Sequence, residues 1–263
     1  MKAIGFCLHD VLDAEQVKPG DVYTLRLADF SEHLRAIEQK KPSIQTIRFR
    51  YEWGDQVPVF LTFDDGAVGS YMFAAPGLEE HGWRGHFFIT TDWIGRDGYM
   101  NRAQIRDLHN RGHIIGSHSC SHPERMSHLA PQDLRREWED SCKILSEIVQ
   151  FPIKTASVAG GYYSRSVAEA AASVGVEVLF NSEPVSGAAL VNGCLVLGRY
   201  SIQSFTSPRV SSGIAAGYRW PSWRQGALWN AKQILKTVGG ESYVTVRRQL
   251  LSLLMTRRSA ARE

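Results

Sequence analysis

Two adjacent carboxylates are the first residues in the sequence that could do chemistry. Asp64 and Asp65 follow directly on the apolar run 57–63 and precede Gly66. Two like charges at short range repel each other, and a buried charge needs a partner, so a bound cation would stabilise the pair. Because Gly66 allows the backbone to turn sharply, at least one carboxylate is expected at the end of a strand.

Two imidazoles form the second candidate. His118 and His122 are four residues apart in the run His-Ser-Cys-Ser-His. This spacing aligns both rings in a helical turn, and it also fits a tight loop around one metal ion. One Asp and two His leave a coordination position open for water or substrate, which is typical of a catalytic metal site. Each motif alone is common in turns and on surfaces, but together they predict a metal centre.

The hydrophobic pattern predicts the elements that position these side chains. Strands are expected at 2–8, 44–50, 57–63, 86–90, 113–118, 154–158, 176–181 and 195–202. Helices are expected at 30–40 with Asp29 as cap, 70–81, 101–112 with Asn101 as cap, 131–149 with Pro131 in the first turn, and 164–174. This alternation predicts a parallel sheet, open or closed as a barrel, whose sites form at the carboxyl ends of the strands. His9, Asp64 and His118 all fall there.

Length and composition favour one globular domain. The chain has 263 residues, of which 43% are hydrophobic and 22% charged, and no Pro/Gly/Ser-rich linker or repeat divides it. We expect a catalytic domain over 1–240 and a tail over 241–263. The tail interleaves apolar residues with arginines, so it is expected to form a basic amphipathic helix that either rests on anionic lipid or closes the domain.

Charge and cysteine content exclude several classes. A net charge of +3 is too small to favour nucleic acid as a partner. The four scattered cysteines form no disulfide framework and fit reduced thiols in the cytoplasm. The N-terminal run is too short for a signal peptide, and no segment reaches the roughly 18 apolar residues of a spanning helix. We expect a soluble, cytoplasmic protein with at most a peripheral contact to the inner face of the membrane through its tail.

The two motifs together resemble those of a known family. Residues 62–66 read Thr-Phe-Asp-Asp-Gly, which resembles the first motif of the polysaccharide deacetylases, and His118-Ser-x-x-His122 resembles the second. The resemblance runs over roughly 58–182, and the N-terminal layout is similar to the exopolysaccharide-associated and poly-N-acetylglucosamine deacetylases. It implies a distorted, TIM-like (β/α) barrel of about seven strands.

The resemblance also implies roles for the motif residues. Asp64 would be the general base, and Asp65, His118 and His122 would hold a divalent metal. Zinc suits these ligands, although cobalt, nickel, manganese and iron also fit. Cys120 could in principle bind the metal, but the family pattern does not use this position, and we expect it to pack inward.

The third motif of the family is degraded here. In place of Arg-x-Pro-x-Gly, residues 157–161 read Ser-Val-Ala-Gly-Gly. The backbone amide of Gly160 could still stabilise an oxyanion, because a backbone donor does not depend on the side chain. The arginine that would orient the catalytic aspartate is missing at Ser157. Arg199 is a candidate to replace it, or it is an ordinary surface arginine.

The general acid of the family is also displaced. Its late Leu-His motif is absent, since the last histidine of the chain is His128, but Leu8-His9 supplies the same dipeptide near the other end. A barrel brings the first and last strands together, so His9 can serve as the acid; otherwise it is a structural histidine at a strand end. Trp93, Tyr162 and Tyr163 could stack on sugar rings or belong to the core.

The sequence therefore predicts a metal-dependent hydrolase that removes N-acetyl groups from a poly- or oligosaccharide, in bacterial exopolysaccharide or envelope synthesis. Two alternatives remain open. One is hydrolysis of a small non-carbohydrate amide by the same machinery, and the other is a catalytically weakened homologue that binds glycan.

Overall fold

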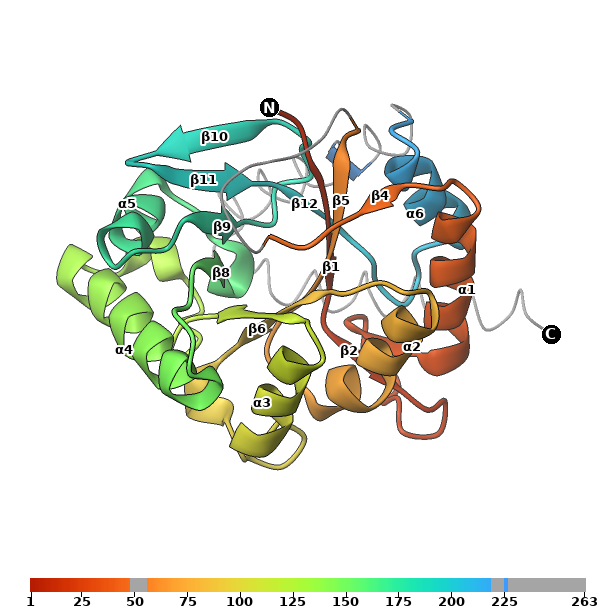
Figure 1. Cartoon of the computed structure of the whole chain (residues 1–263), viewed down its shortest axis with the longest axis horizontal. Helices are drawn as coiled ribbons and strands as arrows, with labels where there is room; N and C mark the ends of the chain where they lie inside the picture. The colour runs from red at the N-terminus through yellow and green to blue at the C-terminus, as the bar shows by residue number, and fades with distance from the viewer. Residues whose placement is uncertain (48–55, 219–224, 227–263) are drawn as a thin grey trace.

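One large sheet forms the centre of the molecule (Figure 1). The computed structural model describes residues 1–47, 56–218 and 225–226. Along the sheet, the strands follow in the order β10 (Ala188–Val191), β11 (Cys194–Leu197), β9 (Val178–Phe180), β8 (Thr155–Ser157), β7 (Ile114–Ser117), β6 (His86–Ile89), β5 (Pro58–Phe63), β1 (Ile4–Leu8) and β12 (Arg199–Ser201), with β4 (Ser43–Ile44) also paired to β5. Every pairing is parallel apart from the β10–β11 hairpin. A separate pair is formed by β2 (Asp10–Leu12) and β3 (Thr24–Arg26).

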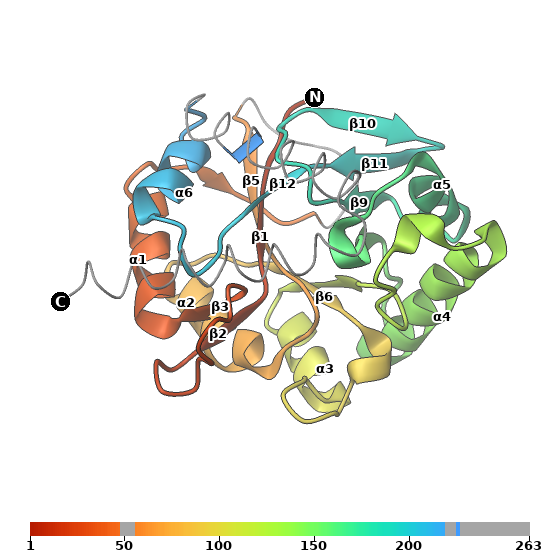
Figure 2. The ribbon, with the colours of Figure 1, turned by 180° about the vertical axis from the view of Figure 1, so that it is seen from behind.

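Helices surround the strands in both ribbon views (Figures 1 and 2). The α-helices are α1 (Leu27–Glu38), α2 (Ala75–Glu80), α3 (Arg102–Asn110), α4 (Pro131–Val149), α5 (Arg165–Ser173) and α6 (Pro208–Ala215). A π-helical turn, η1 (Ser70–Ala74), precedes α2, and short 3₁₀ turns are η2 (Thr91–Trp93), η3 (Met126–His128) and η4 (Ala159–Gly161). Strands covered by helices in this way are buried on both faces.

Capping residues explain most helix boundaries. The start of α4 at Pro131 is as expected, because proline fixes the first-turn dihedral and needs no hydrogen bond there. Asn101 caps α3 in a capping box with Gln104, also as expected. The predicted cap at Asp29 is wrong. Arg26 is the N-cap of α1, and Asp29 lies in the first helical turn, where its charge still favours the helix N-terminus.

The two ends of the parallel part of the sheet, β11 and β12, meet at one residue. β11 pairs with β9 and β12 pairs with β1, yet only Gly198 separates these two strands in the chain. The sheet must therefore curve around until its ends nearly touch, which confirms the distorted (β/α) barrel. The described residues contain no ladder between β11 and β12, so the chain itself joins the ring at Gly198. A Cβ there would lie 2.3 Å from the carbonyl oxygen of Glu183, so only glycine fits.

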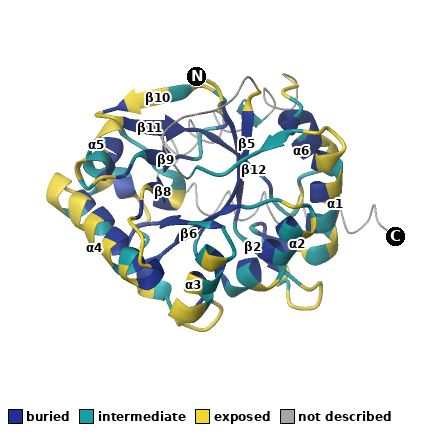
Figure 3. Ribbon diagram, viewed as in Figure 1, coloured by how far each residue is buried: buried dark blue, intermediate teal, exposed yellow. Residues whose placement is uncertain are grey.

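The two faces of the strands contribute to two buried clusters. Phe60, Phe88 and Phe180 pack together with parts of β9 and β11, whereas Leu61 and Phe63 point to the larger cluster shared with the helices. The strands are accordingly buried, and exposed residues lie mainly on the outer faces of helices and on loops (Figure 3). The polar ends of these strands therefore sit on a rigid apolar base.

Some predicted elements differ in detail. The expected strand 195–202 is two strands, β11 and β12, broken at Gly198. β4 is shorter than the predicted 44–50, whose last residues lie outside the described part of the chain, as does the predicted tail 241–263. Within the described residues, no helix is both long and apolar enough to cross a membrane. The four cysteines Cys7, Cys120, Cys142 and Cys194 are free thiols, as expected.

Candidate active site

Neighbouring strand ends bring the predicted residues together. Asp64 follows β5, and its amide donates to the carbonyl of Leu8 at the end of β1 (2.9 Å). His118 follows β7, and its amide donates to the carbonyl of Ile89 at the end of β6 (2.9 Å). The backbone hydrogen bonds of the sheet thus continue into the site, and they fix the Cα positions of Asp64 and His118.

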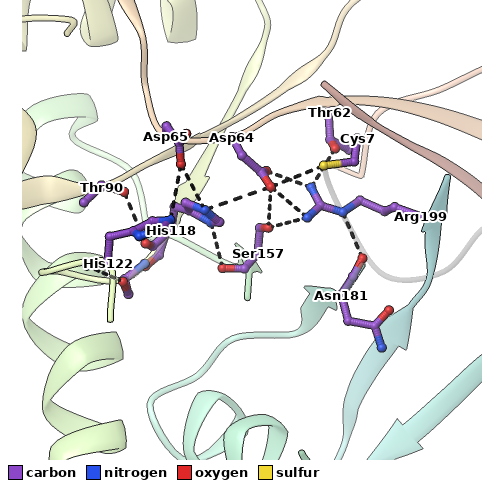
Figure 4. Close-up of polar contacts among 12 residues, drawn as sticks. Cys7, Thr62, Asp64, Asp65, Thr90, His118, His122, Ser157, Asn181 and Arg199 are labelled. Carbon is purple, nitrogen blue, oxygen red and sulfur yellow. Dashed lines mark hydrogen bonds and ion pairs between the residues drawn. The ribbon is translucent and has the colours of Figure 1, made fainter. Parts of the chain in front are cut away.

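Arg199 clamps the buried carboxylate of Asp64 (Figure 4). Its two terminal nitrogens donate to the two Asp64 oxygens at 2.7 and 2.8 Å, which is a bidentate pair. Arg199 is completely buried, so the alternative of a surface arginine is wrong. The same guanidinium donates to the hydroxyls of Thr62 (2.8 Å) and Ser157 (2.7 Å) and to the carbonyl of Asn181 (3.0 Å). Arg199 therefore occupies the place left by the arginine that is missing at Ser157.

The sequence did not single out the other residues around this pair. It marked Ser157 only as the position where an arginine is missing. The Ser157 hydroxyl donates to Asp64 Oδ2 (3.2 Å), and the Cys7 thiol lies 3.5 Å from the same oxygen. Gly5, opposite Arg199 in the β1–β12 register, makes room for the arginine, because a Cβ there would lie 2.8 Å from Arg199 Cγ. A glycine inside a buried strand was the one available signal, since such glycines often mark a close approach.

Opposing effects set the ionisation of Asp64. Burial by itself would raise the pKa of this carboxyl, but the charges of Arg199 and His118 hold the pKa well below its ordinary value. Asp64 is therefore a carboxylate at neutral pH. A buried charge of this kind needs an anchored counter-ion, which Arg199 provides.

Asp65, His118 and His122 form a compact set of candidate metal ligands. One ligand atom from each lies within 4.8 Å of the other two. Asp65 Oδ1 is 3.3 Å from Nε2 of His118 and 3.5 Å from Nε2 of His122. This oxygen is buried and has no hydrogen-bond partner among the described residues. A buried carboxylate oxygen that faces two imidazole nitrogens fits a divalent cation bound between the three side chains.

The tautomer of His118 also fits a metal ligand. Nδ1 lies 3.0 Å from the carbonyl oxygen of Ser157, to which it can only donate. In the neutral ring, Nε2 then carries the lone pair, and it lies 3.3 Å from Asp65 Oδ1. A metal-binding histidine ordinarily donates its other N–H to a carbonyl or carboxylate in this way.

A tight loop, not a helical turn, carries the two histidines. Ser119 and His122 both have positive φ, 66° and 57°. The Ser119 hydroxyl accepts from the amide of His122 (3.1 Å), which closes the loop internally. Of the two geometries that the four-residue spacing allowed, the structure has the loop.

His9 lies beside Asp64, as its position after β1 predicted. Ligand atoms of Cys7, His9 and Asp64 are within 4.8 Å of one another, and the His9 ring centroid is 4.7 Å from that of Tyr23. This second cluster is a poorer metal site than the first, because the Arg199 cation already neutralises Asp64. The role of His9 as general acid stays a prediction.

Gly160 lies against the histidine loop. Its φ is +66°, and a Cβ would come within 2.5 Å of the carbonyl oxygen of Glu124, two residues after His122. Glycine is therefore required at this position. The proposed donation from its amide to an oxyanion stays a prediction.

Cys120 and the aromatic candidates have other contacts. Cys120 does not pack into the core as expected; it is partly exposed, and its sulfur lies 3.3 Å from Asp92 Oδ1 and 3.2 Å from Thr91 Oγ1. Burial raises the pKa of this thiol to about 11, so it is a poor metal ligand. The Trp93 ring stacks on His122, with centroids 4.9 Å apart. Tyr162 packs against Arg125, and Tyr163 against the core.

Comparison with known proteins finds matches to the part of the chain that carries both motifs. The profile of the polysaccharide deacetylase family matches residues 54–179, which include both motifs. The Bacillus subtilis protein YxkH, which is named for the same family, is 28% identical over 160 residues, 61% of this chain and 55% of that protein. The chain thus spans about half the length of this relative.

Solved structures share the fold. The deacetylase PplD from Streptococcus pyogenes, in complex with acetate, superposes with a TM-score of 0.68 at 19% identity over 79% of this chain and 95% of that one. A de-N-acetylase from Aggregatibacter actinomycetemcomitans superposes with a TM-score of 0.63 at 15% identity, over 78% and 96% of the two chains. Motifs, barrel and profile match therefore agree: residues 54–179 form a region of the polysaccharide deacetylase family.

Proposed function

We propose that this protein hydrolyses the acetamide of an N-acetylated sugar unit in an oligo- or polysaccharide, with a divalent metal held by Asp65, His118 and His122. One observation carries the proposal. An ionised, clamped carboxylate, Asp64, lies directly beside a set of three metal ligands at the carboxyl ends of the strands. A site for binding glycan alone needs neither a base nor a metal with an open position.

In the proposed reaction, each residue of the site has a separate role. A bound zinc ion would act as a Lewis acid on the acetamide carbonyl and lower the pKa of water. Asp64 accepts the proton of the attacking water; among the described residues, Arg199 is the one donor to its Oδ1, so this oxygen can accept another hydrogen bond. Arg199 keeps the carboxylate in one orientation. The amide of Gly160 stabilises the tetrahedral oxyanion, and His9 protonates the leaving nitrogen.

The choice of an N-acetyl sugar rests on two supports. The N-terminal position of the Leu-His dipeptide is similar to the exopolysaccharide-associated deacetylases, and one solved structure of this fold is a de-N-acetylase. Exopolysaccharide or envelope synthesis is therefore the proposed setting. The degraded third motif favoured a weakened, glycan-binding homologue, but the contact of Arg199 with Asp64 removes the main reason for that alternative.

Acetate release tests the proposal directly. Zinc-loaded wild type is expected to release acetate from N-acetylglucosamine oligomers, while His118→Ala and Asp64→Asn lose at least about 100-fold in rate, because each removes a ligand or the base. His109→Ala, on α3 and outside the ligand set, is the matched control and should keep full activity. Equal rates for wild type and Asp64→Asn would refute the catalytic assignment. Release from a small acetanilide but not from the oligomers would favour the small-amide alternative.

A further inference from the structure

The loop between the two histidine ligands is held by a side chain from outside both motifs. One carboxylate oxygen of Glu137, on α4, accepts from the amides of Cys120 (2.8 Å) and Ser121 (2.9 Å). The other oxygen accepts from the Ser121 hydroxyl (2.6 Å). Three hydrogen bonds to one ionised group make a strong anchor, since charge-assisted bonds are stronger than neutral ones.

The loop needs such an anchor because its backbone is strained. Ser119 and His122 have left-handed φ angles of 66° and 57°, which residues with a Cβ adopt only at a cost. Within the loop, the bond from the His122 amide to the Ser119 hydroxyl is a local restraint. A second, external restraint keeps the loop from relaxing toward ordinary backbone angles.

The same helix holds the start of the loop as well. Ser117 Oγ donates to Ser141 Oγ on α4 (2.8 Å) and accepts from the amide of Ser119 (3.1 Å). Ser141 follows Glu137 by four residues, so both side chains lie on one face of α4. The helix therefore contacts the loop at two points, one near each histidine.

The two histidines differ in what orients them. The ring of His118 is buried and fixed by the carbonyl of Ser157. The side chain of His122 is 24% exposed, and its ring lies against the rings of Trp93 and His118, with centroids 4.9 and 5.1 Å away, and beside Asp65. The position of this ring therefore depends also on the loop backbone, which Glu137 holds.

We propose that Glu137 is a positioning residue of the metal centre, which places His122 for metal binding without touching the metal. The inference rests on the metal centre of the proposed function. Mutation of a residue that contacts a metal ligand, but not the metal, ordinarily lowers the affinity for the metal without abolishing it. Removal of Glu137 should therefore weaken metal binding, while the folded state persists.

Zinc affinity measured by competition with a chelating dye tests this role. Glu137→Ala is expected to raise the zinc Kd roughly ten- to hundredfold, and Glu137→Gln less, because its amide oxygen can still accept from the loop. Glu139→Ala is the matched control: this exposed residue on the same helix pairs with Arg135, and its Kd should stay within about twofold of wild type. Circular dichroism of the metal-free variants establishes that all are folded.

Hydrogen exchange of the metal-free proteins adds a readout that is independent of metal and activity. Amides of Cys120 and Ser121 should exchange faster in Glu137→Ala than in wild type and Glu139→Ala. A folded Glu137→Ala variant with wild-type zinc affinity would overturn the positioning role and leave the proposed function intact. Wild type that binds zinc no better than His118→Ala would instead refute the metal centre itself, and this inference with it.

Discussion

Arg199 balances the charge of a carboxylate 135 positions away in the sequence. Both groups are buried, so neither can use water as its partner. Removal of one member of such a pair leaves an uncompensated buried charge, whereas removal of both does not. The pair is therefore as important for stability as it is for the orientation of Asp64.

A double-mutant cycle on this pair checks that statement. Arg199→Met should lower the free energy of unfolding of the metal-free protein by about 3–5 kcal/mol, since Asp64 then keeps a buried charge. The double variant Asp64→Asn with Arg199→Met should recover part of this loss. Urea denaturation measures both, with the exposed Arg209→Met as control. Additive losses in the double variant would show that the two residues are not coupled.

At the residue scale, the sequence could predict local motifs but not distant partners. Asp65, His118 and His122 stand out because each has a recognisable neighbour within a few positions. Arg199 and Glu137 do not, since their role depends on which strand or helix face comes to lie beside the motif. Arg199 could be suggested only because a residue was missing at Ser157, and Glu137 carried no signal at all.

At the scale of elements, hydrophobic periodicity and caps predicted most strands and helices correctly. The predicted bounds of α4 agree with the structure at both ends. The run 195–202 was read as one strand because apolar residues lie on both sides of Gly198 and Arg199, and its break depends on the close contact at Gly198. β10 was missed because its run Ala-Ala-Leu-Val is short and does not alternate; the strand lies at the end of the sheet, where residues 189 and 190 are exposed although they are apolar.

The junction between β11 and β12 provides a test at this scale. Gly198→Ala should lower the free energy of unfolding by about 1–3 kcal/mol, because the added methyl group would meet the backbone oxygens of Glu183 and Val185, 2.3 and 2.6 Å from the Cβ position. Gly187→Ala, where nothing lies within 4 Å of the added carbon, should be nearly neutral. Thermal and urea unfolding compare the two. Equal stability of both variants would show that the junction tolerates a side chain.

For the whole molecule, two buried histidines make the protein less stable in acid. Burial lowers the pKa of His86 to about 3 and that of His113 to about 4, against ordinary values near 6.5. At a pH between the folded and the ordinary pKa of these histidines, the unfolded chain binds more protons than the folded protein. The free energy of unfolding therefore falls as the pH falls. Two groups have the opposite effect and offset part of the loss: Asp10, whose pKa burial raises to about 6, and His118, whose pKa is raised by the charges of Asp64 and Asp65 although burial by itself would lower it.

Comparison of wild type with His86→Leu isolates one of these contributions. From pH 6.5 to pH 5, metal-free wild type should lose about 1.5 kcal/mol more of its unfolding free energy than the variant does, because only wild type has this proton to take up on unfolding. All other titrating groups are common to both proteins and cancel. Urea denaturation at the two pH values gives the difference, and parallel losses would mean that His86 is not kept neutral by the fold.

The join at Gly198 also sets an order of assembly during synthesis. The proposed metal ligands have all been made once residue 122 has left the ribosome, but β12, which carries Arg199 and pairs with the first strand, is the last described strand of the barrel to be made. A nascent or truncated chain that ends before residue 199 therefore holds every proposed metal ligand and Asp64, yet lacks the cation that keeps this carboxylate ionised in the interior. During synthesis, the proposed base is completed only after the proposed metal centre.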